Sequence, residues 1–177
     1  LVPQFCRHKT SSLFYACRTE APGVAIIGGI KKELPLAALP SSDAKEIIEL
    51  LKEPYPQLIE EENVLVSDMS NMNAVIHPLP VLLNTGWIEA TKGNFKFYYD
   101  SITPSIGKMI EKLDEERIEI CKALSIEVKS LRESMYFYYG AQGDSIGEMV
   151  RNVNAYNNRI SFRTSWKRPQ GYGKDIR

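Results

Sequence analysis

The sequence predicts a mainly α, α+β chain in which the end of an α/β sheet domain precedes an all-α domain. In the first third, short β-branched or aromatic runs alternate with turn signals and one clear helical pattern. From about Asp68 onward, apolar residues recur at the spacing of α-helices. We therefore expect a domain boundary there, with residues 1–67 in the first domain and residues 68–177 in the second.

The first part is expected to hold strands on both sides of a helix. Residues 13–17 and 24–27 are candidate strands separated by a Pro-Gly turn. Residues 44–51 place apolar side chains on one helical face, and Pro54 stops that pattern. The apolar run at residues 64–66 is the next expected strand. This strand, helix and strand order is typical of half of a crossover unit in a doubly wound sheet.

The second part opens its best helix at Thr103, a good N-cap, followed by Pro104 at the first helical position. Its apolar stripe lasts roughly twenty residues and is interrupted only by Arg117. We expect Arg117 either to pair locally with Asp114, one turn earlier, or to reach a buried partner. A second helix follows, which Gly140 ends.

Further patterns in this part leave alternatives open. Ser145 and Glu148 form a capping box for a third helix. Residues 95–99 carry the remaining strand signal, and the aromatic side chains around them either line a cleft or fill a core. The four aromatics at residues 136–139 must turn one ring outward on a helix. That face is a candidate homodimer contact.

Charge and hydropathy exclude several classes of partner. Lys+Arg and Asp+Glu both number 22, so no global field draws the chain to nucleic acid or to an anionic membrane. The longest uncharged stretch, residues 69–88, is too broken by Asn, His, Pro and Gly to be a transmembrane helix. Residues 159–177 carry six Lys/Arg against one Asp. They are expected to be a solvated loop or a segment that brings cations to an anionic ligand, and a nucleic-acid tail is the third alternative because the run is short and the chain is neutral.

The cysteines point to a reducing compartment. Cys6, Cys17 and Cys121 are odd in number and form no C-x-x-C pair, which favours a cytoplasmic location over a disulfide framework. A zinc site from Cys6, His8 and Cys17 lacks a fourth ligand, so no metal is expected. The chain opens on Leu1 rather than Met, and we expect it to be a piece of a longer protein.

The densest polar signal in an apolar segment lies at residues 70–78. Asn73 and His77 are four residues apart, so a helix places both on one side. Pro78 disfavours a helical backbone at His77, and a helix break is expected there. The segment lies near the expected domain junction, where clefts form. His77 is thus the candidate catalytic residue, and a hydrogen-bonded core histidine is the alternative.

A series of motifs surrounds this histidine in a specific order. With them, nearly the whole chain resembles the octopine/nopaline (opine) dehydrogenase family. The string at His77 is the most specific, and the pieces before it are similar to the end of that family's nucleotide domain. The motifs are Tyr15-Ala16-Cys17-Arg18, Ala37-Ala38-Leu39-Pro40, Asn71-x-Asn73-Ala74-x-x-His77-Pro78, Leu82-Leu83-Asn84-x-Gly86, Phe97-Tyr98, Thr103-Pro104-Ser105 and Leu113-Asp114-x-Glu116-Arg117.

The resemblance implies the C-terminal part of a Rossmann-like domain followed by a helical catalytic domain, similar to the 6-phosphogluconate dehydrogenase C-terminal-like domains. It implies an oxidoreductase that uses NADH or NADPH to condense an amino acid with a 2-oxo acid, giving a secondary amine dicarboxylate. His77 would be the acid/base, because an imidazole exchanges protons near neutrality. Asn73 would orient the histidine or the substrate. Arg177 would bind a substrate carboxylate.

The chain departs from the family pattern in two places. It stops before the Asp that pairs with the histidine in this family, and Asp175 fits that place poorly. The glycine-rich turn that holds the dinucleotide is not in this chain, and Gly28-Gly29 does not replace it. The cofactor-binding residues are therefore unknown. We expect the chain alone neither to bind the dinucleotide tightly nor to turn over.

Two other functions remain open at this point. A related two-domain NAD(P)-dependent dehydrogenase would reduce the keto group of a small carboxylate without an amine. A non-catalytic helical interaction or dimerisation module would use His77 only for structure. Dependence of turnover on an added amino acid separates the first alternative from an opine dehydrogenase.

Overall fold

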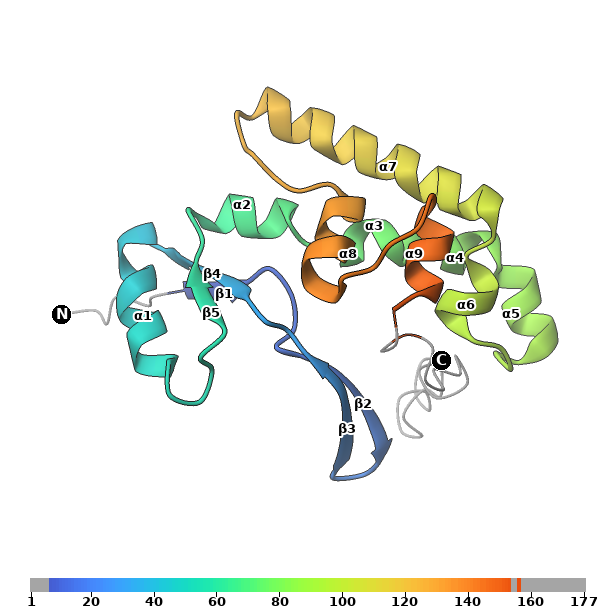
Figure 1. Ribbon diagram of the computed structural model, residues 1–177, viewed down its shortest axis with the longest axis horizontal. Helices are drawn as coiled ribbons and strands as arrows, with labels where there is room; N and C mark the ends of the chain where they lie inside the picture. The colour runs from blue at the N-terminus through green and yellow to red at the C-terminus, as the bar shows by residue number, and fades with distance from the viewer. Residues whose placement is uncertain (1–6, 154–155, 157–177) are drawn as a thin grey trace, which may run out of the picture.

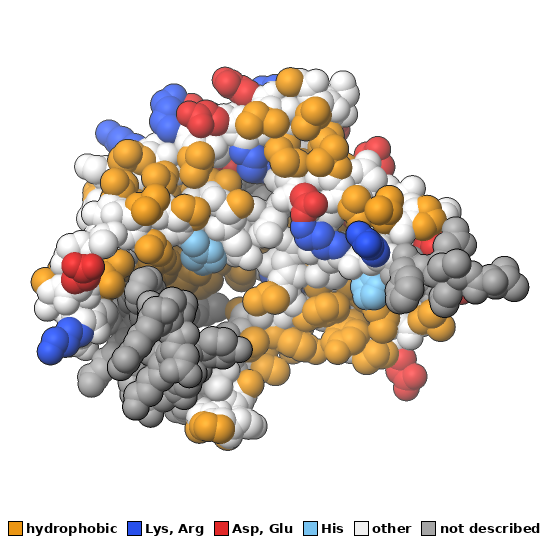
Figure 2. Space-filling model, turned by 180° about the vertical axis from the view of Figure 1, so that it is seen from behind, with side chains coloured by type: hydrophobic (Ala, Val, Ile, Leu, Met, Phe, Trp, Pro, Cys, Tyr) orange, Lys and Arg blue, Asp and Glu red, His pale blue; other side chains and the backbone are white. Residues whose placement is uncertain are grey.

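The computed structural model describes residues 7–153 and 156, apart from the side chains of Arg18 and Glu20. A small β region lies at one end of the molecule and a group of helices at the other (Figure 1). Figure 2 shows Lys, Arg, Asp and Glu side chains interspersed over the face seen from behind, with no broad area of one sign. Among the described helices, none is both long and apolar enough to cross a lipid bilayer.

The β region is built on a central strand that is buried along most of its length. This strand, β4 (Leu34–Leu39), lies between antiparallel β1 (Arg7–Thr10) and parallel β5 (Leu58–Glu60). Helix α1 (Ala44–Leu51) connects β4 to β5 and packs on both. The shared core contains Leu34, Leu36, Ala38, Ala44 and Leu58. A parallel strand, helix and strand crossover is therefore present, and its helix is the expected one, while its strands lie at other residues than expected.

The strands of this crossover differ from the two expected from the sequence. β4 reads LPLAAL, which lacks the β-branched residues on which a strand assignment depends. Its strand state comes from its two neighbours in the sheet. The expected strand at residues 64–66 is wrong, because these residues open helix α2 (Val64–Met69). The Asn63 side chain accepts the Leu65 and Val66 N–H groups at 3.0 Å, and this cap overrides their β propensity.

The expected strands at residues 13–17 and 24–27 pair with each other as a separate hairpin. Strand β2 (Tyr15–Ala21) runs antiparallel to β3 (Val24–Ile30), and Gly23 at the turn has a φ of +78°. Figure 1 shows the hairpin projecting from the rest of the molecule. Apolar β3 side chains remain exposed on it, from Val24 to Ile30.

The helical region has its own core. It includes Ile102 and Ile110 with Leu131, Met135 and Val150, all at most 1% exposed. The strand signal at residues 95–99 is wrong, since a helix begins at Phe97. The helices are α3 (Asn73–Ile76), α4 (Pro78–Leu83), α5 (Thr85–Thr91), α6 (Phe97–Ser101), α7 (Pro104–Ala123), α8 (Leu131–Tyr139) and α9 (Ile146–Arg151).

The expected helix ends are confirmed by their caps. The Thr103 hydroxyl accepts the Ile106 N–H at the start of α7, and Gly140 ends α8 with a φ of +64°. At α9, Ser145 accepts the Glu148 N–H, but the Glu148 carboxylate accepts from Asp144 instead of closing the box. The complete capping box lies at α8, between Ser130 and Glu133.

Arg117 both pairs with Asp114 and reaches partners outside its own helix, which are the two alternatives expected from the sequence. Its guanidinium lies 2.7 Å from Asp114 Oδ1, and both side chains are at most 10% exposed. It also donates to the carbonyl oxygens of Met69 and Lys129, at 2.5 and 2.8 Å. Asp114 Oδ2 accepts the Leu131 N–H at 2.6 Å. This pair therefore joins α7 to the end of α2 and the start of α8.

Helix α2 also contacts the sheet. It packs on β1 and β4, and an ion pair joins Lys9 of β1 to Asp68 of α2. The β region and the helical region are thus connected through one short helix. The division into domains at residues 67 and 68 remains a prediction, and it falls within α2.

Removing one partner of the buried pair should destabilise the protein strongly. In Asp114→Ala, the Arg117 charge stays buried without its carboxylate, and the Leu131 N–H loses its acceptor. We expect the free energy of unfolding to fall by about 3–5 kcal/mol. Urea denaturation of the full-length protein, followed by far-UV circular dichroism, measures this loss.

Glu115→Gln is the matched control, because it removes an exposed ion pair with Lys112 from the same helix. We expect its urea midpoint to match that of the wild type. Equal midpoints for Asp114→Ala and Glu115→Gln would contradict the structural role of the buried pair.

Candidate functional site

His77 lies at the break between two short helices. α3 ends at Ile76, and α4 begins at Pro78, which has no N–H to continue the helical ladder. Both helices pack against α7. The break therefore holds the half-buried imidazole between the ends of two helices, where its backbone is fixed on both sides.

The imidazole has two hydrogen-bond partners. Nε2 lies 2.6 Å from the Tyr98 hydroxyl of α6. The backbone carbonyl of Asn73 also forms a hydrogen bond to the ring. Because a carbonyl only accepts, the nitrogen that faces Asn73 carries the proton in neutral imidazole. Nε2 then has the lone pair, and the Tyr98 hydroxyl donates to it.

Burial lowers the pKa of His77 below its usual range, and the Asn73 carbonyl offsets part of that effect. The imidazole is therefore mainly neutral at neutral pH. With an unprotonated Nε2, His77 is ready to accept a proton from a bound molecule.

Tyr98 begins a row of tyrosine rings that leads away from His77. Its ring stacks on Tyr156, with centroids 4.3 Å apart and an interplanar angle of 19°. Tyr156 lies 5.3 Å from Tyr139, and Tyr139 lies 6.4 Å from Tyr138 at the end of α8. These four residues, the tyrosine row, join the histidine to the far end of α8.

Other aromatic residues belong to a core. Phe95 and Phe97 are buried with Ile88, and Trp87 stacks on Phe95 at 4.2 Å. Phe95 and Phe97 therefore fill the interior of the helical region, while Trp87 covers Phe95 from a partly exposed position. Tyr98 packs partly against them and also reaches the histidine.

Of the other two predicted site residues, Asn73 is described by the structure and Arg177 is not. Asn73 is exposed at the start of α3, one turn before His77. Its backbone N–H donates to the Asn71 side chain, while its own amide group has no hydrogen-bond partner in the described part of the chain. Arg177 lies outside the described residues, as does Asp175.

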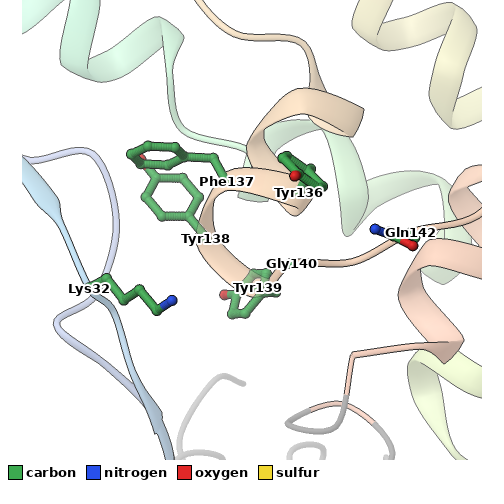
Figure 3. Close-up of a pocket in the computed structure, with 7 residues that line it drawn as sticks. All are labelled: Lys32, Tyr136, Phe137, Tyr138, Tyr139, Gly140 and Gln142. Atoms are coloured by element: carbon green, nitrogen blue, oxygen red, sulfur yellow. The ribbon is translucent and has the colours of Figure 1, made fainter.

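A cavity of about 500 Å³ lies beside the other end of the tyrosine row. Lys32, which follows the β2–β3 hairpin, faces the end of α8 across it (Figure 3). Its lining comprises Lys32, Tyr136, Phe137, Tyr138, Tyr139, Gly140 and Gln142.

Lys31 is the residue of this region that the sequence analysis missed. It is only 6% exposed, and its ammonium lies 4.7 Å from the centroid of the Tyr138 ring. Nζ has no hydrogen-bond partner among residues 7–153 and 156. Burial lowers the pKa of Lys31 to about 8. In the sequence it is one of two adjacent lysines after an apolar run, and nothing there distinguishes it from Lys32.

The described residues contain no group of three His, Cys, Asp or Glu side chains placed to hold a metal ion. Cys6 of the considered zinc site lies outside them, while Cys17 is exposed and Cys121 buried, both as free thiols.

Comparison with known proteins relates the helical region to one family. Residues 60–167 match the family described as NAD/NADP octopine/nopaline dehydrogenase, alpha-helical domain. An opine dehydrogenase of Arthrobacter sp. is 39% identical over 154 residues, covering 87% of this chain and 43% of that protein. A vitopine synthase of Allorhizobium ampelinum is 28% identical over 145 residues, covering 80% of this chain and 39% of that protein.

Solved structures of octopine dehydrogenase share the fold. One holds NADH and L-arginine, with a TM-score of 0.60 and 17% identity over 86% of this chain and 42% of that one. Another holds NADH and agmatine, with a TM-score of 0.61, 16% identity and the same coverage. The expected fold class, part of a Rossmann-like domain followed by a helical domain, is therefore confirmed. The chain spans less than half the length of the curated relatives it matches.

The lowered pKa of His77 can be measured directly. We expect the imidazole Cε1–H signal that disappears in His77→Gln to titrate below pH 6.5 in NMR spectra of the full-length protein. The unfolded chain binds this proton more readily, so stability is lost as pH falls below 6.5.

His77→Gln should therefore lose less stability than the wild type between pH 7 and pH 5. His8→Gln assigns the signal of the other histidine in this chain. A His77 midpoint at or above pH 6.5 would contradict the burial described here.

Proposed function

The chain belongs to the octopine/nopaline dehydrogenase family, whose helical domain it contains, and on this premise we propose that the whole protein is an opine dehydrogenase. The reaction is an NADH- or NADPH-dependent reductive condensation of an amino acid with a 2-oxo acid. The observation that carries the proposal is His77 itself. Within the family's helical domain it lies half-buried at a helix break, with its Nε2 2.6 Å from the Tyr98 hydroxyl and its pKa lowered by burial.

The relatives support this choice of chemistry. A relative at 39% identity is named an opine dehydrogenase, and the matched octopine dehydrogenase structures hold NADH with arginine or agmatine. We extend the dinucleotide and an amino acid substrate to this protein on that basis. The described residues include no glycine-rich turn for a dinucleotide, so its binding is assigned to the remainder of the protein.

His77 manages the protons in this mechanism. Nε2 takes a proton from the ammonium of the amino acid, which leaves a neutral amine to attack the carbonyl carbon of the 2-oxo acid. The protonated imidazole then donates to the carbinolamine hydroxyl, which leaves as water and gives an iminium ion. The dinucleotide, when bound, supplies the hydride that reduces it to the secondary amine.

The proposal also gives Tyr98 and Asn73 roles in these reaction steps. The Tyr98 hydroxyl is hydrogen-bonded to Nε2 in the free protein. A substrate must therefore displace this hydroxyl before it can exchange a proton with Nε2. The Asn73 amide, which has no hydrogen-bond partner among the described residues, is exposed one turn from His77, and we assign it to substrate orientation. Arg177 is retained as a carboxylate anchor on the strength of the resemblance alone.

The cellular location and the oligomeric state of the enzyme are proposed from its composition and its exposed surface. The odd number of cysteines favours the cytoplasm. Tyr136 and Phe137 are 61% and 40% exposed on α8, and this pair supports a homodimer contact. Nucleic acid and membranes are not assigned as partners.

The first experiment is the oxidation of NADH and of NADPH by the full-length protein with pyruvate and a pool of amino acids, leaving out each component in turn. We expect oxidation to require both the 2-oxo acid and an amino acid. Oxidation without any amine would favour reduction of a keto group. A folded protein that oxidises neither dinucleotide would favour the interaction module.

The role of His77 is tested by substitution. We expect His77→Ala to lose roughly 10²-fold or more in kcat, because it removes the proton-exchanging group. His8→Ala, on strand β1 and exposed, is the control and should turn over like the wild type. Full activity in a folded His77→Ala protein would restrict this histidine to a structural role.

A further inference from the structure

We propose that the Tyr98 hydroxyl is a catalytic hydrogen-bond donor to the carbonyl oxygen of the 2-oxo acid, acting beside His77. This inference rests on the proposed function and deepens it, because it assigns a residue to the oxygen that leaves during the reaction. The Tyr98 hydroxyl of α6 lies 2.6 Å from Nε2 of the imidazole. The two groups are therefore close enough to hold one substrate oxygen between them.

The reaction itself places the carbonyl oxygen next to both groups. In the proposed mechanism, the protonated imidazole gives its proton to this oxygen, which then leaves as water. The oxygen must therefore lie within hydrogen-bond distance of Nε2, at about 2.9 Å. An atom at that position is also within reach of a hydroxyl that lies 2.6 Å from the same nitrogen.

Protonation of His77 changes what the Tyr98 hydroxyl can do. In the free protein the hydroxyl donates to the lone pair of Nε2. Once Nε2 has taken a proton from the amino acid, the imidazole is a donor only, and the Tyr98 O–H needs another acceptor. The carbonyl oxygen gains negative charge as the amine attacks, so it becomes that acceptor. Tyr98 keeps its own proton throughout and stabilises this charge by hydrogen bonding alone.

Ring contacts keep the Tyr98 hydroxyl near the imidazole. The ring stacks on Tyr156 with centroids 4.3 Å apart, and Phe97 meets it edge-on at 5.1 Å and 76°. The centroids of the Tyr98 and His77 rings are 5.8 Å apart. These contacts permit only a small shift of the ring. A hydroxyl displaced from Nε2 thus remains within reach of the atom that replaces it.

The backbone that carries Tyr98 is tied to the helix that follows His77. The Asn84 side-chain amide donates to the carbonyl of Pro80 in α4 at 2.8 Å and to that of Ser101 in α6 at 3.1 Å. The relative position of α4 and α6 therefore does not depend on the hydrogen bond between Tyr98 and His77. Removing the hydroxyl should leave the fold of the site unchanged.

The surroundings favour a hydrogen bond to a charged oxygen. Tyr156, on which Tyr98 stacks, is buried deeply enough for its pKa to be raised well above the usual range. In such surroundings a hydroxyl that donates to an alkoxide stabilises it more than it would in water. A carboxylate, in contrast, carries its charge before and after the amine attacks. A donor directed at it would improve binding without raising the rate.

The test compares Tyr98→Phe with Tyr99→Phe in the full-length protein. Tyr98→Phe removes the hydroxyl and retains the stacked ring. We expect its kcat to fall by about 10²-fold, as for loss of one donor to a developing oxyanion. Its KM for the 2-oxo acid should rise by about 5-fold, as for loss of one hydrogen bond. The KM values for the amino acid and the dinucleotide should stay unchanged.

Tyr99→Phe is the matched control from the same helix. Tyr99 is exposed, and its contacts with Lys96 and Arg151 are made by the ring, which phenylalanine retains. We expect this variant to turn over like the wild type. An equal loss of kcat in both variants would assign the effect to the structure of α6 and not to the Tyr98 hydroxyl.

A second substrate separates donation to the carbonyl from a structural role. The fluorine of 3-fluoropyruvate withdraws electrons and stabilises the developing alkoxide, so the reaction depends less on a hydrogen-bond donor. We therefore expect the loss of kcat in Tyr98→Phe to be smaller with 3-fluoropyruvate than with pyruvate. The same loss with both oxo acids would contradict the proposal, as would an unchanged kcat in Tyr98→Phe.

A binding measurement distinguishes failure of this proposal from failure of the proposed function. If the wild type does not oxidise NADH or NADPH with any substrate pair, the proposed function fails. Calorimetric titration of pyruvate into the NADH-saturated protein, without an amine, then tests Tyr98 alone. An affinity about 5-fold lower in Tyr98→Phe only would support a carbonyl site at this hydroxyl. Equal affinities in the two variants and the wild type, or no binding to the wild type, would exclude it.

Discussion

The buried pair of Asp114 and Arg117 is the constraint on which the arrangement of the helical region depends. Its two charges satisfy backbone groups at the end of α2 and at the start of α8, so α7 cannot move without exposing them or leaving them unpaired. α7 in turn contacts α3 and α4, which carry the break at His77. The placement of the imidazole therefore depends on a pair of charges that take no part in the proposed chemistry.

Local signals allowed much of the helical region to be predicted. Thr103, Pro104 and Gly140 define helix ends through their own backbone preferences, and these hold regardless of the tertiary fold. The sheet was predicted less well, because strand β4 owes its state to pairing with β1 and β5. A sequence such as LPLAAL contains little that identifies it before its partners are known.

The candidate site likewise contains one residue that local sequence identifies and others that only the tertiary structure identifies. His77 is recognisable because Asn73 and Pro78 lie within four residues of it, and the family resemblance adds its expected role. Tyr98 lies 21 residues further along the chain, and its contact with Nε2 exists only after α6 has folded against the break. Lys31 is more distant still, and only its burial distinguishes it from the adjacent lysine.

The stacking of Trp87 on Phe95 gives the protein an internal optical probe. Phe95 of that pair belongs to the cluster against which Tyr98 packs, and under the proposed mechanism Tyr98 leaves Nε2 when a substrate binds. Movement of the tyrosine thus alters the surroundings of an indole that is 39% exposed. With the other tryptophan of this chain, Trp166, replaced by Phe, the emission of Trp87 should follow the occupancy of the histidine in real time, without a label and without turnover.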